Sequence, residues 1–153
     1  MDISGNMLFN KKDFPNLTDE NHQITSPATD KYNCIGWALG HDDRWYEPVE
    51  KYYWPNHLPR DYSVGTLVAL FEHEGFSACD HGDQELGFEK VAIFADEHEY
   101  MHAALQLASG QWTSKMGAGE DIQHETLTDV IGPAFGQVVK FMKRERRPPD
   151  VTR

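Results

Sequence analysis

The pattern of hydrophobic positions predicts three short strands, at residues 76–79, 91–95 and 137–142. Residues 91–95, Val-Ala-Ile-Phe-Ala, are the clearest of the three. A short apolar run of this kind is typical of a strand that is buried on both faces. The three runs together predict a small sheet.

The segment at residues 100–107 fits two periodicities. Met101, Ala103 and Leu105 alternate with polar or small residues, as in a half-buried strand, yet Met101, Ala104 and Leu105 also fit helical spacing. On the strand interpretation, residues 108–110 form a hairpin turn and residues 111–115 the return strand. Periodicity alone leaves both alternatives open.

Helix boundaries are marked more clearly than strand boundaries. A short helix is expected to begin near Asn33 and to end at Gly40, which can adopt the left-handed conformation of a C-terminal cap. A second helix is expected from Ser63, as N-cap, to Gly75. Residues 127–131 read as a third, very short helix, which ends at a Gly-Pro pair.

The remaining segments are rich in turn-forming residues. Residues 1–30 read as an irregular lead-in, in which residues 14–17 pack over the core as a strap. Residues 41–60 form a long loop rich in Trp and Tyr, and residues 146–153 read as a disordered tail. The chain is thus expected to be one α+β domain, residues 1–153, with a core at about 30–145.

Charge and composition narrow the range of partners. The net charge is −11 and the isoelectric point about 5.0, which argues against nucleic acid as a partner. The only basic cluster, at residues 140–147, reads as a strand end that runs into a solvated tail.

The chain also carries no membrane or export signal that we recognise. No apolar run approaches the roughly 20 residues that a membrane-spanning helix needs, and the N-terminus lacks the pattern of a secretory signal. Cys34 and Cys79 do not make a disulfide framework. We therefore expect free thiols, a cytoplasmic location and no membrane partner.

Cys34 is the candidate nucleophile. If Asn33 caps the first helix, Cys34 lies in its first turn, where unpaired amide groups favour a thiolate and can stabilise an oxyanion. Asn33 would then adjoin the bound substrate. The structural alternative is that Cys34 is a small buried hydrophobic residue.

His102 is the candidate base for Cys34. On the strand interpretation it lies on the face opposite Met101, Ala103 and Leu105, near Tyr100 and Ala104. A thiol hydrolase needs a base within hydrogen-bond reach and a third group that orients the base. Ser114, on the return strand, is the first candidate for this third group; the others are Gln106, Glu120 and Asp121.

The same histidine belongs to a competing motif. Residues 98–102 read His-Glu-Tyr-Met-His, the H-E-x-x-H pattern of zinc peptidases, which requires a helix and a third ligand such as His124 or Glu125. The preceding strand leaves little room for a helix before Gly110. A chance match is the better interpretation, and we expect no metal and no cofactor.

The aromatic residues offer a possible substrate cleft. Trp112 and the loop at residues 45–54 could line it, although Trp and Tyr beside proline commonly serve packing. Trp112 is kept as a candidate substrate-binding residue. Cys79 has no helix N-terminus in its neighbourhood and is expected to be inert.

Four blocks of the sequence resemble a family of small, uncharacterised bacterial domains. The family patterns are N-C-I-x-W-A-L-G, T-H-A-A-R-Q-L, W-T-S-K-x-G and D-I-x-H, which match residues 33–40, 101–107, 112–117 and 121–124 here. The order of a helix Cys and a strand His, followed by a hairpin, is similar to that of papain-like cysteine peptidases.

The resemblance implies a papain-like α+β fold, with the Cys34 helix packed on a small antiparallel sheet. It implies a cysteine hydrolase that acts on a peptide or amide bond, with Cys34, His102 and Ser114 as catalytic residues. Its partner would be a peptide or protein substrate and, for a toxin-type domain, an inhibitor or immunity protein. The chain departs from the papain-like pattern at Ala28, where an oxyanion-hole Gln is usual. The alternative is a non-catalytic binding or regulatory module.

Overall fold

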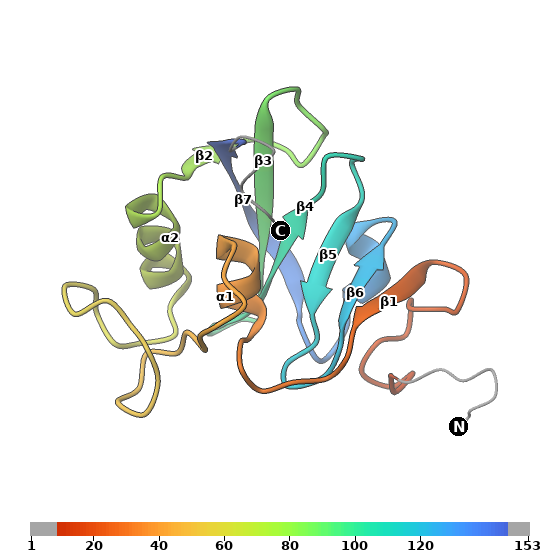
Figure 1. Ribbon diagram of the computed structural model, residues 1–153, viewed down its shortest axis with the longest axis horizontal. Helices are drawn as coiled ribbons and strands as arrows, with labels where there is room; N and C mark the ends of the chain where they lie inside the picture. The colour runs from red at the N-terminus through yellow and green to blue at the C-terminus, as the bar shows by residue number, and fades with distance from the viewer. Residues whose placement is uncertain (1–8, 147–153) are drawn as a thin grey trace.

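One antiparallel sheet of seven strands, in the order β1-β6-β5-β4-β3-β7-β2, organises the chain (Figure 1). The computed structural model describes residues 9–146, so residues 1–8 of the predicted lead-in and residues 147–153 of the predicted tail lie outside the described residues. The strands are β1 His22–Ser26, β2 Ser77–Cys79, β3 Phe88–Ala95, β4 Tyr100–Gln106, β5 Trp112–Lys115, β6 Asp121–His124 and β7 Gln137–Glu145.

The prediction of a papain-like α+β fold is wrong, because the fold is β-rich. Its α-helices are α1 Cys34–Leu39 and α2 Val64–His73, of 6 and 10 residues, to which η1 Leu127–Val130 adds one short 3-10 turn. The sheet is larger than expected because two segments with weak strand signals join it. β1 lies in the predicted lead-in and pairs with β6, which was not predicted as a strand.

Residues 100–106 are a strand because they have a partner on both sides. β4 pairs with β3, with Phe94 opposite His102, and with β5, with Leu105 opposite Thr113. Gly110 has a φ of 95° in the turn between β4 and β5, which confirms the predicted hairpin. Pairing of β4 with strands on both sides therefore decides in favour of the strand over the helix.

The predicted ends of α1 are confirmed. Asn33 accepts a hydrogen bond from the Gly36 amide, and Gly40 follows the helix with a φ of 101°. The N-cap of α2 is confirmed in the same way, since the Ser63 side chain accepts from the Thr66 amide. Local capping chemistry thus determines where both helices begin.

The two faces of the sheet carry two separate cores. The first core lies under α1 and α2 and includes Ile35, Leu70, Ile93, Ala103 and Leu105. The second core lies on the opposite face and is covered by the N-terminal segment and the chain around η1. It contains Leu17, Ala92, Phe94, Ala104, Trp112, Met116, Ile122, Val130 and Phe135, with Phe14 packed against it. The predicted strap at residues 14–17 is therefore confirmed.

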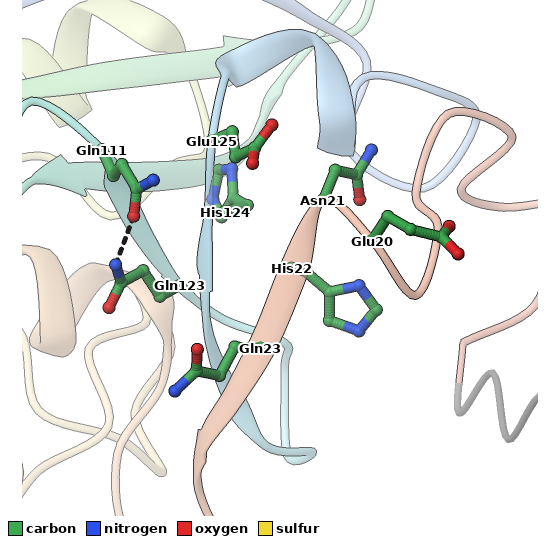
Figure 2. A pocket seen from close by; sticks show the side chains of 8 residues that line it. All are labelled: Glu20, Asn21, His22, Gln23, Gln111, Gln123, His124 and Glu125. Carbon is green, nitrogen blue, oxygen red and sulfur yellow. Dashed lines mark hydrogen bonds between the residues drawn. The ribbon is translucent and has the colours of Figure 1, made fainter.

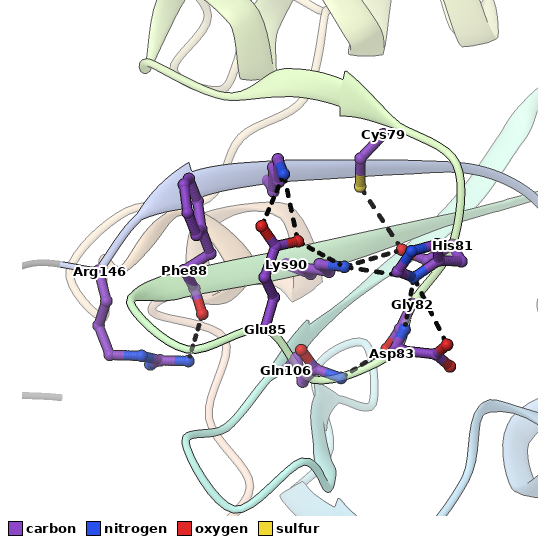
Figure 3. Close-up of polar contacts among 10 residues, drawn as sticks. Cys79, His81, Gly82, Asp83, Glu85, Phe88, Lys90, Gln106 and Arg146 are labelled. Carbon is purple, nitrogen blue, oxygen red and sulfur yellow. Dashed lines mark hydrogen bonds and ion pairs between the residues drawn. The ribbon is translucent and has the colours of Figure 1, made fainter.

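Lys143 and Arg144 of the predicted basic cluster are paired within the fold. Arg144 of β7 lies 2.8 Å from the Glu89 carboxylate, and Lys143 lies 2.9 Å from Glu85. Lys90 is almost completely buried and lies 3.3 Å from the same Glu85 (Figure 3). Lys143 and Lys90 thus hold Glu85, in the loop between β2 and β3, against the sheet.

Cys79 lies beside this cluster. Its thiol donates to the carbonyl of His81 at 3.5 Å, and Lys90 donates to the same carbonyl at 3.2 Å (Figure 3). Cys79 is half-buried at the end of β2, on the side of the sheet order farthest from β1.

Candidate functional site

A cavity of about 290 Å³ lies beside Cys34. It is formed where the start of α1, the loop after it, the segment before α2 and the start of β4 meet. Its wall consists of Asn33, Cys34, Ile35, Trp45, Tyr46, Glu47, Tyr62, Glu99, Tyr100, Met101 and Gly117. Two of these residues, Asn33 and Cys34, were predicted site residues.

Asn33 joins α1 to the loop that forms the opposite wall of the cavity. Its side-chain oxygen accepts from the amides of Gly36 and Tyr46, at 3.2 and 3.1 Å, and its side-chain nitrogen donates to the Tyr46 carbonyl at 2.7 Å. The loop also approaches α1 very closely, since a Cβ on Gly36 would lie 2.7 Å from the Arg44 carbonyl oxygen. Asn33 therefore shapes the cavity, and its polar atoms are already bonded within the protein.

Glu47 is held in place by two donors. The indole of Trp45 donates to one carboxylate oxygen at 2.8 Å, and the Tyr62 hydroxyl donates to the other. Burial, reinforced by the bond to Glu47, raises the pKa of Tyr62 to about 12, so Tyr62 stays protonated and remains a donor. Glu47 thus brings a fixed negative charge to the cavity wall.

Cys34 is not an acidified thiol, contrary to the prediction. The residue is half-buried, and burial raises the pKa of its thiol to about 11. Interactions with the backbone of Ala103, Ile35 and Cys34 itself act in the opposite direction but do not outweigh burial. The thiol is therefore neutral at pH 7.

His102 lies on the other face of the sheet from Cys34. Cys34 packs against the first core, together with Ala103 and Leu105, whereas the His102 ring is fully buried and stacks on Phe135 of the second core, at 3.8 Å. The predicted pairing of Cys34 with His102 is therefore wrong, because the sheet separates the two side chains.

Ser114 does bond to His102, as predicted, but the pair belongs to a longer chain. The His102 Nε2 lies 2.9 Å from the Ser114 hydroxyl, which lies 2.8 Å from the His124 Nε2, and the His124 Nδ1 lies 2.9 Å from the Thr126 carbonyl. A carbonyl can only accept, so the His124 Nδ1 carries the proton and its Nε2 accepts from Ser114. Ser114 in turn accepts from the His102 Nε2.

This direction of donation leaves the His102 Nδ1 as an acceptor, and it has no hydrogen-bond partner. Burial and the neighbouring His124 lower the pKa of His102 well below its usual value, and burial also lowers the pKa of His124. Both rings are therefore neutral structural groups. The sequence motif indicates His124 only as a third zinc ligand, and no local signal predicts its bond to Ser114.

His124 also reaches a second, smaller pocket of about 100 Å³ at the β1 end of the sheet (Figure 2). Its wall is polar and consists of Glu20, Asn21, His22, Gln23, Gln111, Gln123, His124 and Glu125. Figure 2 shows that Gln123 donates to Gln111 on one side of this pocket. The pocket contains none of the predicted catalytic or substrate-binding residues.

The zinc motif does not form a site. His98 lies in the turn between β3 and β4, and His102 lies within β4, so the helix that the motif requires does not exist. Between residues 9 and 146, no group of three or more His, Cys, Asp or Glu side chains is arranged to hold a metal ion.

The aromatic residues divide between cavity and core. Trp112 is a buried member of the second core, so its predicted contact with substrate beside Cys34 is wrong. Trp45 and Tyr46 of the aromatic loop line the cavity, whereas Trp54 is buried in the first core. Glu47, Tyr62 and Tyr100 carry no local signal of a site and come together only in the folded chain.

Comparison with known proteins gives a match to a protein family. The model of a family described as a domain of unknown function (DUF7689) matches residues 23–143. No curated protein and no solved structure matches the chain. Within residues 9–146, no helix is both long enough and apolar enough to cross a membrane.

Proposed function

The chain belongs to the DUF7689 family, whose description gives no activity, and we propose that the protein is a non-catalytic binding module. Its cavity accepts a positively charged group of a peptide or protein partner. One observation carries this proposal. The cavity wall contains two carboxylates, Glu47 and Glu99, and four aromatic side chains, but no basic side chain. Carboxylates and aromatic rings are the groups that attract cations in proteins.

The state of Cys34 supports a binding role over a catalytic one. A thiol with a pKa of about 11 is a weak nucleophile at pH 7, and the imidazole that would activate it belongs to the opposite core. The predicted cysteine hydrolase thus lacks both an activated thiol and its base. The binding module requires neither.

The charge of the whole chain supports the same class of partner. A net charge of −11 attracts cationic partners over long range and repels nucleic acid and anionic lipid. The basic partner would be a peptide or another protein, which includes an inhibitor or immunity protein. We place this binding in the cytoplasm, where the free thiols of Cys34 and Cys79 stay reduced.

Peptides that differ in one side chain test the proposal. We expect short peptides with a cationic central residue to shift the NMR signals of the cavity residues, and matched peptides with Glu or Leu at that position to leave them unchanged. The cationic panel contains lysine, arginine and trimethyllysine. Equal shifts from the cationic, anionic and neutral peptides would refute a cation-binding role.

Replacement of Glu47 by Gln removes the fixed charge of the cavity while it keeps the size of the side chain. We expect Glu47→Gln to weaken the tightest cationic peptide about tenfold, since a close, partly desolvated charge contributes roughly 1–2 kcal/mol. The matched control is Glu20→Gln, which changes the net charge equally but lies in the pocket of Figure 2. Equal losses in the two variants would mean that only overall charge matters.

A further inference from the structure

Several hydrogen-bond acceptors in the wall of the cavity beside Cys34 already accept a bond within the protein. The Asn33 side-chain oxygen already accepts from two amides, and the Tyr46 carbonyl accepts from the Asn33 side chain. The Tyr62 carbonyl accepts from the Tyr100 amide at 2.9 Å. These polar groups therefore stabilise the cavity wall, and part of their capacity to accept hydrogen bonds is already used.

The Gly117 carbonyl is engaged from behind the wall. Lys115 is fully buried, and its ammonium donates to Gly117 at 2.6 Å and to Thr29 at 2.7 Å. The ammonium also lies 5.0 Å from the centre of the Tyr32 ring. Lys115 is thus held behind the cavity wall, close enough for its charge to act on Cys34, and the carbonyl that it binds has one of its two acceptor positions filled.

Glu47 attracts a cation by its charge more than by open acceptor sites. Trp45 and Tyr62 each donate to one of its two carboxylate oxygens. Glu99 is exposed, so water screens its attraction for a cation and competes for its carboxylate oxygens. The cavity wall therefore offers negative charge and aromatic rings, while several of its acceptor atoms already hold one hydrogen bond within the protein.

This combination selects among cations. A lysine ammonium has three N–H donors and an arginine guanidinium has five, and donors that lose water without gaining acceptors weaken binding. A fully alkylated ammonium has no N–H donor and is attracted by aromatic rings and by charge alone. The thiol of Cys34, the thioether of Met101 and the side chain of Ile35 add soft, apolar contacts for its methyl groups.

We propose that the cavity recognises a fully alkylated ammonium group, such as the side chain of trimethyllysine in a peptide. This inference rests on the proposed function, because it names the cation that the binding module takes. A cavity of about 290 Å³ lies at the lower end of the usual range for ligand cavities, which suits a head group rather than a whole cofactor.

The test uses one peptide sequence with four different central residues, measured by calorimetry on the full chain. These residues are lysine, trimethyllysine, arginine and the neutral isostere in which carbon replaces the trimethylated nitrogen. We expect trimethyllysine to bind at least tenfold more tightly than each of the other three. Tetramethylammonium and choline, used as competitors, distinguish a free small molecule from a peptide side chain, because a small-molecule site binds them as tightly as the peptide.

The outcomes separate this inference from the proposed function. If lysine or arginine binds as tightly as trimethyllysine, the inference is overturned and the cation-binding role stands. If the neutral isostere binds as tightly as trimethyllysine, charge does not matter and both proposals fail.

Tyr62→Phe provides an independent test of the mechanism. This variant keeps the ring but removes the hydroxyl that occupies one oxygen of Glu47. We expect it to strengthen binding of the lysine peptide and so to reduce the preference for trimethyllysine several-fold. Tyr52→Phe is the matched control, since it removes a hydroxyl from a ring outside the cavity wall. An unchanged preference in Tyr62→Phe would contradict the role given to the occupied acceptors.

Discussion

Iodoacetamide is expected to alkylate Cys34 slowly at pH 7, at a rate that rises about tenfold per pH unit until about pH 11. Only the thiolate reacts, and a pKa of about 11 leaves roughly one thiol in ten thousand ionised at pH 7. An activated cysteine would instead show a fast rate that is already constant near pH 7. The measurement is mass spectrometry of the labelled peptide from pH 6 to 11, in a Cys79→Ser background that leaves Cys34 as the single thiol of the chain.

His102→Leu is the control for this experiment. The His102 ring is part of the second core, so this variant is expected to change stability but not the pH profile of Cys34 labelling in the folded protein. Ser114→Ala serves the same purpose with a smaller change of volume. Rapid labelling at pH 6 that either variant slows would restore the catalytic hypothesis and remove the basis for a non-catalytic module.

The same pKa predicts how stability changes in alkaline solution. The folded state holds the Cys34 proton more tightly than the unfolded chain, whose thiol has a pKa of about 8.5. The contribution to stability is therefore fully present below about pH 8.5 and is lost as the pH rises towards about 11. Cys34→Ser is expected to remove this part of the pH dependence from urea unfolding curves.

Replacement of Arg144 by Met is expected to cost about 3–5 kcal/mol of the free energy of unfolding. Glu89 is buried and the Arg144 side chain is 12% exposed, and two nitrogens of the guanidinium lie 2.8 and 2.9 Å from one oxygen of Glu89. The guanidinium also donates to the carbonyls of Glu74, at the end of α2, and of Leu39, at the end of α1, at 3.0 and 3.3 Å. Its loss leaves a buried carboxylate without its strongest partner and releases both helix ends.

Urea unfolding of the single and double variants measures this effect. Arg144→Met with Glu89→Gln is expected to lose less than the sum of the single changes, because the second substitution removes the charge that the first leaves buried. Lys143→Met is the matched control, since its pair with Glu85 is more exposed and should contribute no more than about 1 kcal/mol. A loss for Arg144→Met as small as that for Lys143→Met would contradict a structural role for the buried pair.

The local features of the fold could be predicted from the sequence because they depend on residues close together in the chain. Asn33 and Gly40 bound α1 through capping bonds, and Ser63 begins α2 in the same way. The alternation along β4 also correctly placed His102 on the face opposite Ala103 and Leu105. Capping bonds and the alternation of side chains along a strand depend only on residues that are close together in the sequence.

Tertiary structure decided which face of the sheet α1 covers, and therefore whether Cys34 and His102 could lie together. The apolar side of α1 is buried best against Ile93, Ala103 and Leu105, which leaves His102 on the far face. Met101 has no partner in β3, so the register between β3 and β4 shifts by one residue at this position. Tyr100 therefore joins the first core although His102 does not. Alternation gives two faces but does not say which of them a helix covers.

Long-range pairing also decided the size of the sheet and the chemistry of the cavity. β1 has a weak strand signal because most of its residues are exposed, and it becomes a strand by pairing with β6, about a hundred residues later. Glu47, Tyr62 and Tyr100 carry no shared motif and meet only at the cavity. Burial, which depends on the whole fold, determines whether the Cys34 thiol is charged. The sequence by itself therefore identified Cys34 as a candidate but did not determine the protonation state of its thiol.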